Sequence, residues 1–487
     1  MEIPVFSLGQ PSRRTGLGGY SMKTTVVGGI GFVAMLLMFM AGQRTFAFTV
    51  IAPITVVLLA LVTFRVGGRS VATSLQMMFQ DLRRRHRGED VYIAGRLSQV
   101  PGGTYKLPGT LARTELLEGL DGNGNAFGVI YDRPRREATV LLDTQLSGQT
   151  AMTQDERNAQ TANWGRWLAG LSMPGDIVSA ATVVATRPGS GALVRGEVAA
   201  TVHDEAPWIA RQVQAEAAAT LVGGVPEIEA HIAVTIKVRG TNSDEEFLDL
   251  LGTRLPGMYE DLQWAGILAR PMAATDVIAR VHARFCPSTE ADLEAMGVQG
   301  IEHNLQWEDA GPQIAVTKRG EYCHEQVKSV TWEMGQAPRS TFEDHILQGL
   351  IAPHPRVERK RVCLVYRPFD AGKGASKVEA EHKDALVAAN SSKKIRSASA
   401  ELRLEHTEAA RRAQARGAQL GQYSLFVTAT IDRDGDLRRL RHDVEQLGAG
   451  CSIVLRPMTY QQDAGFITSL GVGQIPWSKS STAKVAN

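Results

Sequence analysis

The first residues to consider are those whose types and spacing could hold a nucleotide phosphate. A nucleotide-hydrolysing loop has the form Gly-x-x-x-x-Gly-Lys-Ser/Thr, because backbone amides and the lysine must cradle the phosphates. The nearest stretch is Gly372-Lys373-Gly374, but Arg367 stands where the first glycine belongs and no hydroxyl residue follows the lysine. We therefore expect this chain neither to bind nor to hydrolyse ATP by itself.

Two runs of Asp and Asn residues have part of the spacing of a calcium-binding loop. They are Asp121, Asn123 and Asn125, and Asp432, Asp434 and Asp436. A calcium loop needs glycine at its sixth position, where these runs have Ala126 and Leu437, and the first run ends in Asp132 instead of glutamate. Because Asp, Asn and Gly are common turn residues, we interpret both runs as turns.

Side chains that could carry out catalysis or bind a metal are scattered. The eleven histidines form no His-Glu-x-x-His motif, and no Gly-x-Ser-x-Gly is present. His345 and His354 lie near Glu343 and Asp344, but without ligand spacing. We predict no catalytic, cofactor-binding or metal-ligating residue and no cofactor, and we expect that the chain is not an enzyme. Catalytic triads are assembled in space, so a membrane-tethered enzyme with an unrecognised site stays open as an alternative.

Composition limits the class of protein further. The 487 residues allow two or three domains, and 21% charged with 44% hydrophobic residues is a globular balance. A net charge of +2 argues against nucleic acid as a main partner, so no direct sequence-specific nucleic-acid binding is expected. No two cysteines form a Cys-x-x-Cys pair, which predicts isolated thiols in a reducing compartment: Cys286, Cys323, Cys363 and Cys451.

Two uncharged apolar runs near the N-terminus predict a transmembrane helical hairpin over residues 24–64. The runs are Thr24–Ala41 and Phe46–Phe64, each close to the length that crosses a bilayer core. The connecting loop carries one charge, Arg44, whereas basic residues gather outside both spans, at 13, 14 and 23 and at 65–87. The positive-inside rule then places both termini and the large following region in the cytoplasm, with the protein in the cell membrane.

Strand-like runs that end in Arg-Pro suggest an internal repeat. The arginines are Arg187, Arg270, Arg367 and Arg456, and the spacings within the two pairs are similar, at 270 − 187 = 83 and 456 − 367 = 89. Proline cannot donate to a sheet ladder, so it is suited to the end of a strand. We interpret the four arginines as surface charges at strand ends.

The predicted elements follow the same order in the two halves of the chain that these Arg-Pro pairs define. Each half is expected to begin with a hairpin, at 127–142 and at 314–332, and to continue with a helix containing Trp164 or Phe342. An alternating strand then precedes a helix in each half, the first helix opening with Ser243 and the second near Asp434 or Asp436. The fold class predicted is α+β, with two repeated ferredoxin-like α+β units of which the second carries a long helical insertion.

The predicted domain order can be given by residue ranges. It comprises a cytoplasmic segment (1–23), the hairpin (24–64), a basic juxtamembrane linker (65–89), the first α+β repeat (90–300), the second (301–477) with its helical insertion (376–420), and a polar tail (478–487).

From about Tyr131 to Trp477 the chain resembles the N-terminal, non-ATPase region of the VirB-type ATPase of conjugative type IV secretion systems. The closest stretches run from Arg361 to Phe369, from Tyr423 to Ala429, from Ile453 to Met458 and from Gln461 to Pro476. The hairpin looks like the small PrgI-like two-span membrane protein encoded beside that ATPase. The whole resembles actinobacterial conjugation proteins that fuse the two.

This resemblance implies an inner-membrane scaffold component of a DNA- or protein-transfer machinery. The partners implied are a separate conjugation ATPase and other secretion-channel membrane subunits, with the chain as an oligomer in a complex. The family's nucleotide-binding domain has no counterpart after the segment matching Phe466–Trp477. A two-span membrane subunit of a type VII secretion system is the alternative within the same broad class.

Overall fold

The protein, described here from a computed structural model, divides into two compact units, whose described residues lie within 22–89 and 90–475. The structure describes residues 22–475 except positions 67, 96–97, 99–106, 146–147, 149–151, 202, 204, 222–224, 242, 337–343, 370, 392–397, 416, 418 and 420. The predicted N-terminal segment, apart from its last two residues, and the predicted polar tail lie outside the described residues.

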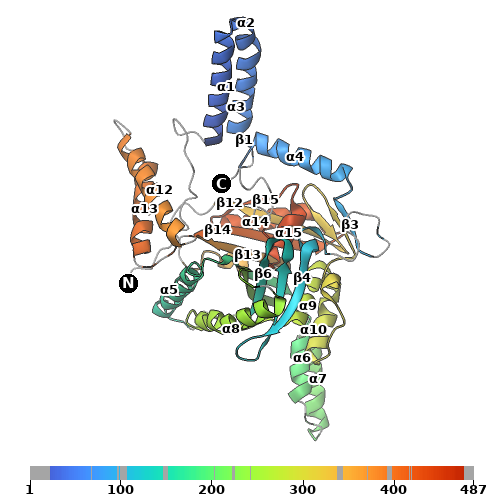
Figure 1. The fold of residues 1–487 in the computed structure, drawn as a ribbon. Coiled ribbons are helices and arrows are strands. Elements are labelled where there is room, and N and C mark those ends of the chain that lie inside the picture. The colour runs from blue at the N-terminus through green and yellow to red at the C-terminus, as the bar shows by residue number, and fades with distance from the viewer. Residues whose placement is uncertain are drawn as a thin grey trace. The chain divides into compact units, whose positions relative to one another are not determined.

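The smaller unit contains an apolar helical hairpin (Figure 1). Its first arm is α1 (Met22–Met40), and its second arm runs through α2 (Arg44–Phe46), a π-helical turn (Ala47–Ile51) and α3 (Ala52–Thr63). The arms approach closely at Gly31, where a Cβ would lie 2.2 Å from the Cγ2 of Thr55. The helix from Arg44 to Thr63 is long and apolar enough to cross a membrane, whereas the apolar stretch Thr24–Met40 is shorter.

A third helix follows the hairpin within the same unit. The short strands β1 (Arg65–Val66) and β2 (Arg69–Ser70) pair with each other, and α4 (Val71–His86) begins directly after them. Ser70 caps α4, because its hydroxyl accepts a hydrogen bond from the Thr73 amide at 3.3 Å.

The larger unit is built on one 13-stranded sheet, and all pairings between its described strands are antiparallel. The strands are β3 (Val91–Ile93), β4 (Thr114–Leu120), β5 (Ala126–Asp132), β6 (Glu137–Gln145), β7 (Ile177–Pro188), β8 (Pro226–Lys237), β9 (Leu268–Pro271), β10 (Ile314–Thr317), β11 (Tyr322–His324), β12 (Val327–Gln336), β13 (Arg359–Pro368), β14 (Gly421–Asp432) and β15 (Val454–Pro457). Helices and strands therefore alternate around an antiparallel sheet, which is the mixed α and β class that the sequence predicts.

The sheet is continuous across residue 300, where we predicted a boundary. Its order is β3-β10-β11-β12-β14-β13-β7-β8-β6-β5-β4, with β15 beside β12 and β9 beside β6. The central contact joins β7 to β13.

Cross-strand neighbours form an uninterrupted row over eight strands. In spatial order the row is Arg270, Asp143, His231, Val183, Cys363, Phe426, Glu333 and Arg456. Arginines that precede proline thus end the row on both sides.

Eleven helices are described in the larger unit. They are α5 (Gln154–Gly170), α6 (Ala192–Thr201), α7 (Trp208–Leu221), α8 (Asp244–Gln263), α9 (Ala274–Phe285), α10 (Glu290–Val298), α11 (Gln348–Ile351), α12 (Ala371–Ser391), α13 (Ala398–Ala415), α14 (Leu437–Gly450) and α15 (Gln462–Ser469).

The helices cover both faces of the sheet. Residues of α9 and α15 share one core with β7 and β13, including the fully buried Phe285 and Phe466. On the other face, α5 and α8 cover the strands around Val140, and α11 and α14 cover those around Val427. The pairs α6–α7 and α12–α13 project from this body (Figure 1).

Several local predictions are confirmed. The first hairpin pairs β5 with β6 through the turn Arg133–Arg135. Ser243 caps α8, accepting from the Glu246 amide at 3.2 Å, and Asp436 caps α14.

Other local predictions need correction. The second predicted hairpin is a three-stranded meander, because a tight turn at Glu325, with φ of 47°, separates β11 from β12. The helix predicted around Ile346 shortens to one turn, α11, while Phe342 lies outside the described residues. On α8 the side chains of Phe247, Leu251 and Leu255 are buried, whereas that of Leu250 is exposed.

Candidate functional site

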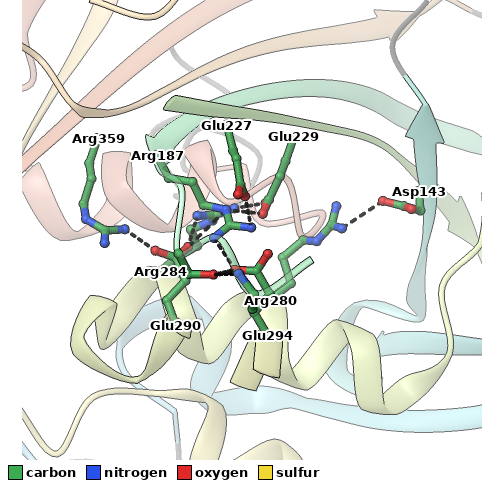
Figure 2. Close-up of polar contacts among 11 residues, drawn as sticks. Asp143, Arg187, Glu227, Glu229, Arg280, Arg284, Glu290, Glu294 and Arg359 are labelled. Atoms are coloured by element: carbon green, nitrogen blue, oxygen red, sulfur yellow. Dashed lines mark hydrogen bonds and ion pairs between the residues drawn. The ribbon is translucent and has the colours of Figure 1, made fainter. Parts of the chain in front are cut away.

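The most concentrated group of charges lies where α9 and α10 pack against the ends of β7, β8 and β13. Figure 2 shows four arginines and five carboxylates interleaved there. They are Arg187, Arg280, Arg284 and Arg359, with Asp143, Glu227, Glu229, Glu290 and Glu294. We call this set the charge cluster.

Arg187 is the centre of the charge cluster. The side chain comes from the end of β7 and is almost completely buried. Its Nη2, Nε and Nη1 atoms lie 2.6, 2.6 and 2.9 Å from carboxylate oxygens of Glu227, Glu229 and Glu294 respectively. Because β8 supplies two of these acids and α10 the third, Arg187 ties the helix to the sheet.

A second bridge joins α9, α10 and β13. Glu290, at the start of α10, accepts from the Nη1 of Arg284 at 2.8 Å and also pairs with Arg359 of β13. Arg284 in turn donates to Glu229 of β8. Helices α9 and α10 are thereby linked to each other and to strands on both sides of the β7–β13 contact.

The charge cluster shifts the pKa of some of its members. The positive charges of Arg284, Arg280 and Arg187 outweigh the cost of burial and lower the pKa of Glu229 to about 2. The carboxylates around Arg187 raise its pKa despite burial. Glu229 and Arg187 are therefore ionised at neutral pH, and each of these two buried charges is compensated by opposite charge and hydrogen bonds.

Arg361 lies beside the charge cluster but has no carboxylate partner among the described residues. Its guanidinium carbon lies 4.6 Å from the ring centroid of Phe466, and Nη2 donates to the Ser469 hydroxyl at 3.2 Å. Burial, and then the charge of Arg284, lower the pKa of Arg361 to about 9. This cation is therefore held by a ring and by neutral groups.

Cavities beside the charge cluster are only large enough for a water molecule. One of about 10 Å³ is lined by His231, Arg284 and Arg361, and a neighbouring one of about 20 Å³ by Arg359 and Lys360. A substrate of ordinary size does not fit such spaces. The charge cluster is suited to holding helices on the sheet, and its geometry does not indicate catalysis.

A larger hollow of about 420 Å³ lies between α5 and α8. Its polar lining comes from Asn163, Arg166, Arg254 and Asp261, and Trp264 borders it. Arg254 is engaged by Asp176 at 2.7 Å. No histidine, cysteine or hydroxyl residue lines this groove, so its described residues provide no thiol or hydroxyl nucleophile and no histidine base.

The phosphate- and metal-site candidates from the sequence lie apart from both places. Gly372 and Gly374 are in the first turn of α12, and the Asp121 carboxylate closes a turn by accepting from the amides of Asn123 and Asn125 at 2.9 and 2.7 Å. In the described part of the chain, no group of three or more His, Cys, Asp or Glu side chains could hold a metal ion.

The remaining candidates also occupy separate positions. The Nδ1 atom of His345 lies 3.5 Å from the Oδ1 atom of Asp344. His354 forms an isolated antiparallel β-bridge with Val357, and Glu343 is outside the described residues. The four cysteines are free thiols, and burial raises the pKa of Cys363 to about 12.

The interpretation of the Arg-Pro arginines as surface charges is wrong for Arg187 and right for Arg270, whose side chain is 76% exposed. Arg456 is intermediate, at 23%. The difference arises because α9 and α10 cover the end of β7. A signal in the sequence was available: the i, i+4 pairs Arg280–Arg284 and Glu290–Glu294 put like charges on one side of consecutive helices.

Comparison with known proteins adds one match. Residues 13–73 match a family described as a domain of unknown function, DUF8461, which covers the apolar hairpin and the start of α4. No curated protein matches the chain.

Proposed function

We propose that the larger unit consists of two copies of one ferredoxin-like unit. Each copy has the order strand, helix, strand, strand, helix, strand, with the spatial order 4-1-3-2. The first copy is β9-β6-β8-β7 and the second is β15-β12-β14-β13.

Matched contacts support this proposal. The cross-strand neighbours outward from Val183 are His231, Asp143 and Arg270, and those outward from Cys363 are Phe426, Glu333 and Arg456. Each series therefore ends in an ion pair, Asp143–Arg270 at 3.6 Å and Glu333–Arg456 at 2.8 Å.

Matched hydroxyl pairs point the same way. Thr139 and Thr235 are 3.0 Å apart in the first copy, and Ser329 and Thr430 are 2.7 Å apart in the second. Both pairs stand at the same place in the register of the two proposed copies, as a repeat would produce.

We further propose that the chain is an inner-membrane scaffold of a conjugative type IV secretion machinery, anchored by the apolar hairpin and docking a separate ATPase. The observation that carries the anchoring is the exposed apolar surface of α1 and α3, including Phe32, Leu37 and Val56. Leaving so much apolar area in water is costly, at roughly 25 cal/mol per Å². The secretion system itself rests on the resemblance of the larger unit.

The helix pair α12–α13 is our candidate for the ATPase-docking surface. The two helices pack together, and Val378 and Ala385 are buried, while Leu386 and Val387 of α12 remain exposed. The pair projects between β13 and β14 as an insertion in the second copy (Figure 1).

The insertion can be removed without breaking the sheet. Pro368 and Gly421 are direct cross-strand neighbours, so a short Gly- and Asn-rich turn can replace residues 369–420. Pro188 and Pro226 are likewise paired, so replacing residues 189–225 removes α6–α7 as a matched control.

The experiment is recovery of the ATPase with the affinity-tagged chain from membranes of the native host. We expect removal of α12–α13 to abolish recovery and removal of α6–α7 to leave it unchanged, with both variants keeping the thermal transition of the larger unit. Equal recovery with all variants would contradict the docking proposal. ATP turnover by the purified chain would contradict the scaffold proposal, and recovery of a type VII secretion ATPase would assign the chain to that system.

A further inference from the structure

Helix α4 has an apolar stripe that the described residues of the smaller unit leave exposed. Leu75, Met78, Phe79 and Leu82 are spaced three, one and three residues apart, so they lie on one side of the helix. All four are exposed, Phe79 by 67% and Leu82 by 56%. Because no described element of the smaller unit covers this stripe, the 16-residue helix requires an apolar environment from outside that unit.

Basic residues border this stripe. Arg83 and Arg85 project on its two flanks, and Arg84 and Arg87 add positive charge at the same end of the helix. Asp81 is the one acidic side chain within α4, and it is paired with Arg85 at 2.9 Å. The surface that covers α4 must therefore be apolar inside and negatively charged at its border.

The start of α4 is fixed to the end of the apolar hairpin. The Val71 amide donates to the Phe64 carbonyl at 3.0 Å, one residue beyond the end of α3 at Thr63. The exposed Phe64 and the basic Arg65 and Arg69 lie at this junction. Helix α4 thus begins at the level where the apolar helix meets charged residues.

We propose that α4 lies in the plane of an anionic membrane surface, with its apolar stripe among the acyl chains and its arginines at the lipid phosphates. Such a boundary provides both chemistries that the helix requires, and long arginine side chains reach from the acyl region to headgroups. The inference rests on the proposed anchoring of the hairpin and adds a second, lipid-selective contact to it.

The test places a fluorescent amino acid, dansylalanine, at Phe79 or at the neighbouring Gln80 of the full-length protein. Gln80 is also exposed and lies on the opposite side of the helix, so it is the matched control. Each protein is reconstituted into nanodiscs of phosphatidylcholine alone or with phosphatidylglycerol. Quenching is measured with nitroxide-labelled lipid and with acrylamide in the water.

We expect lipid quenching several-fold stronger at position 79 than at position 80 in the anionic nanodiscs, and the reverse order with acrylamide. The substitutions R83Q and R85Q each lower the equilibrium constant for the surface-bound state about fivefold. Lowering the fraction of phosphatidylglycerol in the nanodiscs weakens this state in the same direction. Equal acrylamide quenching at both positions, with the hairpin still resistant to alkaline extraction, overturns this proposal alone. Position 79 shielded from both quenchers also overturns it, in favour of a protein partner. Extraction of the protein at alkaline pH instead overturns the anchoring on which it rests.

Discussion

Val183 and Cys363 lie directly opposite each other at the contact between β7 and β13. Each lies four residues before the arginine of an Arg-Pro pair, since 187 − 183 = 4 and 367 − 363 = 4. The two strands therefore meet at equivalent positions, as a two-fold axis between the proposed copies requires. Both side chains are almost fully buried in the shared core.

The symmetry of this contact predicts matched costs for matched substitutions. V183N and C363N each bury a polar side-chain amide in the same core and should each lower the free energy of unfolding by about 2 kcal/mol or more. The measurement is urea unfolding of the detergent-solubilised chain followed by tryptophan fluorescence. V194N, at a half-exposed position of α6, is the control and should cost little. A large cost for one of the paired positions and none for the other would argue against an equivalent role.

The charge cluster predicts that removing one acid is more damaging than its small volume suggests. E290Q leaves Arg284 and Arg359 partly uncompensated where β13 meets α10, so we expect a loss of about 3–5 kcal/mol. D292N changes an exposed carboxylate of the same helix and should change stability by less than about 0.5 kcal/mol. Equal thermal midpoints for the two variants would show that the charge cluster does not hold α10.

Two buried histidines predict a loss of stability in acid. Burial lowers the pKa of His231 and of His324 to about 3, from an unfolded value near 6.5. The geometry at His324 agrees with a neutral ring, because Nδ1 donates to the Phe285 carbonyl at 2.6 Å while Nε2 can accept from the Ser329 hydroxyl at 2.8 Å.

The sign follows from proton binding. Below pH 6.5 the unfolded chain binds a proton at each histidine and the folded chain does not, so stability is full above pH 6.5 and falls as the pH drops toward 3. Each histidine should lower the free energy of unfolding by about 2.5 kcal/mol between pH 7 and pH 4.5. H231F, which introduces the residue that the proposed repeat places at the equivalent position 426, should reduce this slope, whereas H442F at an exposed position should not. Unfolding curves at several pH values provide the measurement, and an unchanged slope in H231F would contradict a neutral His231.

The distribution of arginines around the hairpin predicts the orientation. We expect both termini in the cytoplasm, so a reporter fused after Asn487 should be active only in a cytoplasmic assay. Replacing Arg65 and Arg69 with glutamine should lower this preference, while a change confined to the distant Arg411 and Arg412 should not. Activity of an exported reporter at the same fusion point would reverse the assignment.

The sequence by itself determined the local features of this protein. Apolar runs, Ser243 and Asp436 as helix caps, and Arg-Pro at strand ends depend on near neighbours along the chain, so their positions could be predicted. The order of the strands and the pairing of β7 with β13 could not, because this pairing joins residues 180 positions apart and the local pattern of a strand does not specify its neighbour. The burial of Arg187 was decided in the same way, since only the packing of α10 over the end of β7 brings Glu294 to it and turns a strand-end charge into part of the core.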